Sequence, residues 1–274
     1  MAEAEAELKE AAGNAAESAK AVRRTMIAPI VSSIKSALVI CKMWDRKYQT
    51  APDFVVIEGP CAGGHLGFSR EQLTEYGADT PDVAQTYDRE KYDQEIRGII
   101  ETVKTYAEKY KKEIPVISAG GVFDREDVMH QMSLGADGVQ VATRFVTTEE
   151  CDASPTFKQT YIDSSKDDIE IIASPVGMPG RAIGGEFIRR VKEGLMRPKK
   201  CPFHCIKTCD YTKSPYCIIM ALYNAAKGNL SKGYAFCGAN AYMSKKITSV
   251  RETIESLKSE FAAACRRNGQ TAVL

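Results

Sequence analysis

Short, continuous apolar runs recur through the first half of the chain. They are Ala28 to Val31, Phe54 to Ile57, Val116 to Ser118 and Gly138 to Val141. Such runs are typical of strands in a parallel sheet, because helices cover both faces of that sheet and leave no polar face. The pattern therefore predicts four parallel strands in an α/β protein.

Helical periodicity fills the intervals between these runs. Ser33 to Lys47, Asp88 to Lys112 and Arg125 to Leu134 each carry apolar residues three or four positions apart, which predicts helices with one apolar face. The interval from Phe68 to Thr86 lacks this pattern. We expect a loop there, either one that covers an active site or a plain solvent loop.

Beyond residue 150 the alternation of strands and helices stops. Ile218 to Lys227 and Ile247 to Cys265 predict helices, and Gly228 to Asn240 predicts an irregular stretch. At the other end, Ala2 to Arg24 is rich in Ala, Glu and Lys, which favours a solvated helix and offers no strand.

A glycine-rich turn follows the second apolar run. Glu58 to Gly67 reads Glu-Gly-Pro-Cys-Ala-Gly-Gly-His-Leu-Gly, with His65 directly after two glycines. Glycine is required where a backbone turns sharply or approaches a ligand closely. On the residues alone, His65 either contacts a ligand or is a turn histidine satisfied by backbone groups.

A second arrangement of small residues follows the third and fourth runs. Ile114 to Val122 ends in Gly120 and Gly121, and Gly135 to Phe145 passes through Ala142 and Thr143. A Gly-Gly turn exposes backbone N–H groups from which a phosphate can accept hydrogen bonds, and the ends of parallel strands commonly hold ligands. These turns therefore predict a phosphate cradle, with tight packing turns as the alternative.

These three segments resemble the flavin-dependent nitronate monooxygenase family and the related flavin-dependent enoyl reductases. Glu58 to Gly67, Pro115 to Gly121 and Gly138 to Phe145 follow the family pattern in the same order. The resemblance extends through Ile27 to Ser33, Trp44 to Arg46, Ser174 to Arg181 and Cys201 to Cys217, and so covers roughly residues 26 to 250.

The resemblance implies an FMN-dependent oxidoreductase that acts on a small molecule, an alkyl nitronate or nitroalkane, with dioxygen. Ala62, Gly63 and Gly64 would pass beneath the flavin, and His65 would be the catalytic base or a hydrogen-bond donor. Gly120, Gly121, Ala142 and Thr143 would bind the FMN phosphate, with Ser118 and Val141 beside them. An enoyl reductase would use the same motifs to pass hydride from a nicotinamide cofactor.

The implied fold is a (β/α) barrel of the TIM type, but only about four βα units are present. The expected organisation is an N-terminal helical segment at 1–25, a partial flavin-binding barrel at 26–150, and a helical, cysteine-rich extension at 151–274 that packs on the barrel. A complete barrel has eight units. We expect either a homo-oligomer or complementing barrel half that supplies the rest, or a non-catalytic fragment.

Composition excludes some partners and favours a compartment. The 37 basic and 36 acidic residues give a net charge of +1, which indicates neither nucleic acid nor an anionic membrane surface. No apolar run reaches the roughly 18 residues of a membrane span, and the acidic, alanine-rich start is not that of a secretion signal. We expect a cytoplasmic protein.

The cysteines are expected to stay reduced. Cys41, Cys61, Cys151 and Cys265 are scattered, whereas Cys201, Cys205, Cys209 and Cys217 cluster around His204. The cluster matches neither a zinc ribbon nor a ferredoxin run. If a helix began at Pro202, three of these cysteines would share one face. Reduced cysteines packed beside the barrel are predicted, with a metal site as the alternative.

Overall fold

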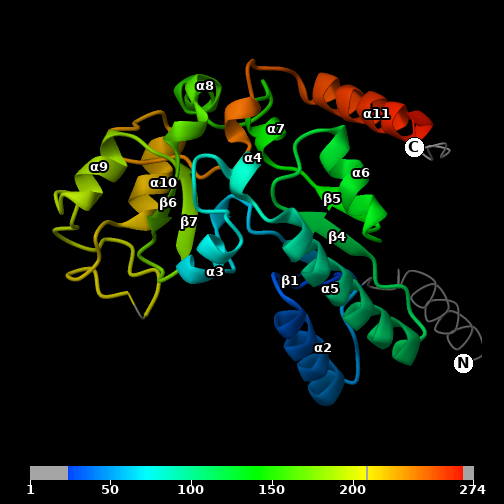
Figure 1. Ribbon diagram of the computed structural model, residues 1–274. Helices are drawn as coiled ribbons and strands as arrows, with labels where there is room; N and C mark the ends of the chain where they lie inside the picture. Colours follow the sequence, from blue (N-terminus) through cyan, green and yellow to red (C-terminus); the bar gives the residue numbers. More distant parts are fainter. Residues whose placement is uncertain (1–23, 208, 268–274) are drawn as a thin grey trace, which may run out of the picture.

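The computed structural model describes residues 24–207 and 209–267, and it contains a four-stranded parallel sheet (Figure 1). The strands are β1 (Ile30–Val31), β2 (Val55–Glu58), β4 (Val116–Ala119) and β5 (Gly138–Gln140). They pair in the order β1-β2-β4-β5, each pair parallel. The prediction of four adjacent parallel strands in chain order is confirmed, although β1 is shorter than its apolar run.

The predicted helices connect these strands. They are α2 (Ile34–Tyr48), α5 (Arg89–Tyr110) and α6 (Arg125–Ser133). Each begins after a residue whose side chain accepts a backbone N–H of the first turn: Ser33, Asp88 and Asp124. Ile96, Ile99 and Val103 of α5 are buried in the main core together with the central strands.

The outer edge of the sheet carries exposed apolar side chains. Ile30 of β1 is 61% exposed, and Leu38, Val39 and Met43 on α2 are also exposed. Only Ala37 and Cys41 of α2 are buried, and its apolar residues Ile40 and Trp44 are half-buried. The helix was therefore predicted correctly, but fewer of its apolar residues are buried against the rest of the described chain than its apolar pattern suggested.

The interval from Phe68 to Thr86 is not a structureless loop. It contains α3 (Arg70–Glu75) and α4 (Val83–Thr86). Ser69 and Gln72 form a reciprocal capping box at the start of α3, and Leu73 is fully buried. These helices are too short to show a full apolar period, which is why the pattern did not reveal them.

A second, antiparallel sheet brings together both halves of the chain. Its strands are β3 (Gly64–His65), β6 (Ile169–Ala173) and β7 (Pro179–Ile183), in the order β3-β7-β6. The segment after residue 150, for which only helices and an irregular stretch were predicted, therefore also contains two strands. Because β3 is part of the first glycine motif, this sheet positions His65 against β7.

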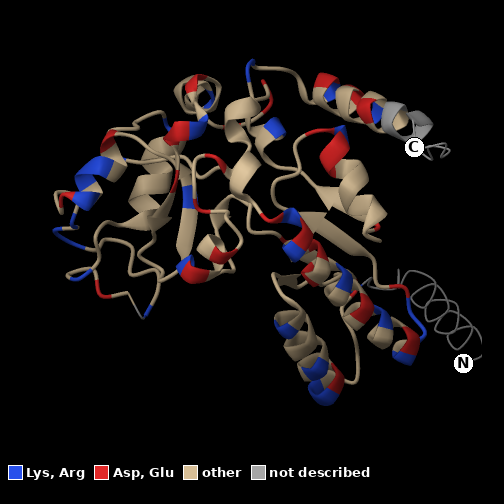
Figure 2. Cartoon of the chain, viewed as in Figure 1, with Lys and Arg blue, Asp and Glu red and all other residues tan. Residues whose placement is uncertain are grey.

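The remaining helices surround the second sheet and the end of the first. They are α7 (Thr143–Val146), α8 (Pro155–Asp163), α9 (Glu186–Lys192), α10 (Ile218–Ala226) and α11 (Val250–Arg267), with short 3₁₀ turns at Lys166–Asp168 and Ala241–Met243. α11 lies along α6 (Figure 1). Charged residues lie mainly on the helices and in the loops, and the strands carry few (Figure 2). The predicted helix at Ala2 to Arg24 falls, apart from Arg24, outside the described residues.

The cysteine-rich segment is irregular. No helix forms between Cys201 and Cys217 in its described part, so a helical face of cysteines is wrong. All four cysteines border a hollow of about 280 Å³, and Cys205 and Cys209 are exposed. Within the described ranges, no three His, Cys, Asp or Glu side chains are arranged to hold a metal ion. Likewise, no helix there is both long enough and apolar enough to cross a bilayer.

Candidate active site

The glycine motifs meet at a hollow of about 270 Å³ above the carboxyl ends of the parallel strands. Seven of the residues predicted to bind a cofactor line it: Ala62, Gly63, Gly64, Gly120, Gly121, Ala142 and Thr143. They come from three separate segments of the chain, each following a different strand. The parallel order of β2, β4 and β5 brings these segments together, because equivalent ends of parallel strands share one edge of a sheet.

Close packing together with a positive φ explains why glycine is needed at two of these positions. Gly121 has φ +81°, and a Cβ there would lie 2.8 Å from Cys61 Cβ. Gly120 has φ +95°, and a Cβ there would lie 2.9 Å from the backbone of Gly59. The second motif therefore packs directly against the first, and side chains would push the two apart. At Gly64, in contrast, a Cβ would meet nothing within 4 Å.

Backbone donors are available at the second turn. Among the described residues, no hydrogen bond uses the N–H of Gly121 or of Val122 as donor, whereas the Gly121 carbonyl accepts one from Asn240 Nδ2 at 2.7 Å. Because buried N–H groups normally have a partner, these two can donate to a ligand in the hollow. Asn240 holds the turn in place from the opposite side of the peptide.

His65 is half-buried and does not itself line this hollow. Its Nε2 is 2.7 Å from Ser174 Oγ, and its ring packs edge-on against Phe236, with 4.9 Å between the centroids. Gly64 and Phe236, its neighbours, both line the hollow. Partial burial lowers the pKa of His65, so the imidazole is neutral at pH 7. His65 is therefore held by a side chain, not by backbone groups as in the alternative reading.

Two predicted residues take other positions. The Ser118 hydroxyl is buried and donates to Gln131 Oε1 at 2.7 Å. It lines a second hollow of about 430 Å³, on the other side of the Gly120–Gly121 turn, which also contains Arg89 and Asp127. Val141 lines neither hollow. Both residues match the family motif in sequence, but neither lines the hollow formed by the glycine motifs.

Several residues of the hollow were not predicted from the sequence. They are Glu58, Tyr161, Phe236, Cys237 and Gly238, together with Ala119, Val122, Gln140 and Val146. Burial raises the pKa of the Glu58 carboxyl, and it raises that of the Cys237 thiol to about 12, so the thiol is uncharged. Of these residues, Gly238 is the one that the sequence could have indicated, because an isolated glycine often marks a place where another backbone approaches closely. Gly63 indeed packs against Cys237 and Gly238.

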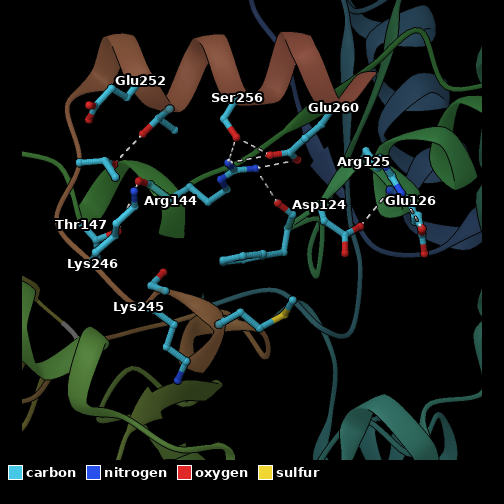
Figure 3. Close-up of a pocket in the computed structure, with 15 residues that line it drawn as sticks. Asp124, Arg125, Glu126, Arg144, Thr147, Lys245, Lys246, Glu252, Ser256 and Glu260 are labelled. Atoms are coloured by element: carbon cyan, nitrogen blue, oxygen red, sulfur yellow. Dashed lines mark hydrogen bonds and ion pairs between the residues drawn. The ribbon is translucent and has the colours of Figure 1, made fainter. Parts of the chain in front are cut away.

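A larger hollow, about 590 Å³, lies elsewhere, between the start of α6, α7 and α11 (Figure 3). Arg144 crosses it and donates hydrogen bonds from its two terminal guanidinium nitrogens to the Glu260 carboxylate, at 3.1 and 3.2 Å. Arg144 also donates to Ser256 on α11 and to the Phe123 carbonyl. Its charge is thereby compensated, and this arrangement anchors α11 to the end of the parallel sheet.

Comparison with known proteins gives a family. A model of the nitronate monooxygenase family matches residues 9–260. A probable nitronate monooxygenase of Staphylococcus saprophyticus is 31% identical over 141 residues, which are 52% of this chain and 34% of that protein. The corresponding protein of Staphylococcus haemolyticus is 33% identical over the same shares. The chain thus spans about a third of the length of the curated relatives that it matches.

Solved structures show the same fold at lower identity. FabK from Thermotoga maritima aligns with a TM-score of 0.61 and 24% identity, covering 89% of this chain and 63% of FabK. A nitroalkane oxidase from Streptomyces ansochromogenes aligns with a TM-score of 0.60 and 20% identity, covering 89% and 59%. At these identities the likeness establishes a shared fold.

Proposed function

The chain belongs to the nitronate monooxygenase family, and on that basis we propose that it binds FMN in the hollow between Gly64 and Gly121 and oxidises alkyl nitronates with dioxygen. The single observation that carries this proposal is the convergence of the three motifs on one hollow. A partial barrel of the TIM type, with four βα units, is part of the proposal. The four parallel strands and their connecting helices support it.

The residues of the hollow suit a flat cofactor with a phosphate. Ala62, Gly63 and Gly64 form a wall without bulky side chains, and the space next to Gly64 is open. The N–H groups of Gly121 and Val122 would hold the phosphate, together with Ala142 and Thr143 at the neighbouring strand end. FMN, when bound, would supply the redox chemistry. Ser118 and Val141 would act indirectly, by shaping the strand ends.

His65 would be the base that removes the substrate proton. A neutral imidazole can take the α-proton of a nitroalkane, and the lowered pKa keeps it neutral. If Nε2–H donates to Ser174 Oγ, the lone pair is at Nδ1, which would then be the basic atom. Ser174 is buried and would fix this tautomer and the ring orientation. Anionic nitronates have already lost that proton and would not need the base.

Substrate oxidation by the full chain tests the proposal. Purified chain supplemented with FMN is expected to consume dioxygen with ethylnitronate and to release nitrite. Two other results would count against this function. NADH-dependent reduction of an enoyl thioester would favour the related enoyl reductases, and binding of FMN without turnover would favour a fragment that needs a second barrel half or a second copy of the chain.

A further inference from the structure

Arg181 is a buried cation directly behind the wall of the hollow. It lies on β7 and is 1% exposed. One guanidinium nitrogen donates to the Pro60 carbonyl at 2.9 Å and to the Ala62 carbonyl at 2.5 Å. The other donates to the Ala78 carbonyl, which follows α3. Arg181 therefore joins three parts of the chain: β7, the first glycine motif and the segment between α3 and α4.

The charge of Arg181 has no carboxylate in direct contact. No ion pair of Arg181 occurs within 4.0 Å among the described residues, and its hydrogen bonds go to three carbonyls; the Asp79 carboxylate favours the charged form of Arg181 from a greater distance. Burial lowers the pKa of the guanidinium, but arginine stays protonated in proteins. Burying a charge without an ion-pair partner is costly, and neutral donors could satisfy the same three carbonyls without that cost. The packing of the turn alone does not explain why a cation is used.

The field of this charge reaches the walls of the hollow. The Arg181 charge favours the thiolate form of Cys61 and of Cys237, opposing the burial that raises the pKa of both thiols. Cys237 lines the hollow, and Cys61 precedes its wall residue Ala62. In a buried environment this interaction is weakly screened by salt. Arg181 therefore contributes a positive potential on the side of the first motif, where the Glu58 carboxyl also lines the hollow.

We infer that Arg181 is a positioning residue that shapes the Ala62–Gly64 wall and makes the hollow favour the anionic, reduced form of the cofactor over its oxidised form. The inference rests on the proposed binding of FMN. Two-electron-reduced FMN carries one more negative charge on its ring near neutral pH than oxidised FMN does. A fixed positive charge beside the ring would therefore strengthen binding of the reduced form and facilitate electron transfer from the nitronate.

Two substitutions separate the charge from the hydrogen bonds. Arg181→Lys keeps the charge with fewer fixed donors, and Arg181→Gln keeps amide donors without the charge. The affinities of oxidised and of photoreduced FMN are measured under anaerobic conditions for each variant. In Arg181→Gln the preference for reduced FMN should fall at least about tenfold, which corresponds to about 1.4 kcal/mol. In Arg181→Lys the preference should stay within about twofold of the parent while both affinities decrease.

Lys158 offers a matched control. It is 6% exposed, and its Nζ donates to the carbonyls of Thr148 and Glu149 at 2.6 and 3.0 Å, but it does not line the hollow. Lys158→Gln should therefore leave the preference for reduced FMN unchanged.

The outcomes separate this inference from the proposed function. A parent chain that binds no FMN overturns both. A parent that binds FMN, with an unchanged preference in Arg181→Gln, overturns the role of Arg181 alone. If Arg181→Gln does not fold, Arg181→Lys decides: a retained preference for reduced FMN supports the inference, and a lost preference contradicts it.

Discussion

Substitution of Gly121 should separate close packing of the two glycine motifs from simple backbone strain. Gly121→Ala would place a β-carbon in a left-handed residue, φ +81°, and 2.8 Å from Cys61 Cβ. Backbone strain contributes roughly 1–2 kcal/mol, and overpacking roughly 1–3 kcal/mol. The expected loss is thus about 2–5 kcal/mol out of the roughly 5–15 kcal/mol that stabilises a domain.

Gly177 is the matched control for strain. It has φ +84° in the turn between β6 and β7, and a Cβ there would meet nothing within 4 Å. Gly177→Ala should therefore lose only the strain contribution, roughly 1–2 kcal/mol. The difference between the two variants, about 1–3 kcal/mol, measures the contact with Cys61.

Urea unfolding followed by circular dichroism gives these free energies, and FMN titration shows the effect on the site. Cys61→Gly removes the β-carbon that Gly121→Ala would meet. In the double variant, most of the extra loss of unfolding free energy should therefore be recovered, which a double-mutant cycle measures as a favourable coupling. Gly121→Val should also abolish FMN binding, because displacement of the first motif would distort both walls of the hollow. Equal losses in Gly121→Ala and Gly177→Ala, with no coupling to Cys61, would refute the packing argument.

Three further predictions concern His65, Ser174 and Asp53. His65→Ala should slow turnover of neutral nitroalkane by roughly 10²-fold or more while leaving anionic nitronate and FMN binding nearly unchanged; equal losses with both substrates would mean that His65 orients the substrate. Because burial lowers the pKa of His65, the activity of the parent chain with nitroalkane should persist at and above about pH 6.5 and fall only below it. Ser174→Ala should shift the pH at which this activity falls, measured in a pH–rate profile, without changing the affinity for FMN. Hydrogen bonds from Lys112 and from the Ile27 N–H lower the pKa of Asp53 to about 2, so its ionised form stabilises the fold above pH 4, and this contribution is lost as the pH falls towards 2. Asp53→Asn should reduce the free energy of unfolding by about 2 kcal/mol at pH 7, and urea titrations that show the same difference at pH 3 would contradict this assignment.

The parallel sheet could be predicted from the sequence because its signals are local. Apolar runs such as Phe54 to Ile57 have one interpretation when helices separate them, and the caps Ser33, Asp88 and Asp124 mark the helix starts. The antiparallel sheet had no comparable signal. β3 has two residues, and its pairing with β7 joins positions more than 100 residues apart, which no local pattern encodes.

The candidate site was predictable to the same extent. Residues within the glycine motifs lie at the hollow because their strands are parallel neighbours, whereas Phe236 and Cys237 reach it only through the fold of an irregular segment. The family resemblance also predicted Ser118 and Val141 beside the cofactor, but a matching motif does not give the direction of a side chain. The helical interpretation of Cys201 to Cys209 failed for a related reason: cysteines four residues apart are compatible with a helix, yet nothing else in the segment favours one.

Binding of FMN to the purified full chain tests the central claim most directly. Flavin fluorescence should be quenched on titration with one FMN per chain, and Gly121→Val should abolish this binding, whereas His65→Ala and Gly177→Ala should not. A chain that does not bind FMN, or one whose affinity is unchanged by Gly121→Val, would contradict the assignment of the hollow between Gly64 and Gly121 as the cofactor site.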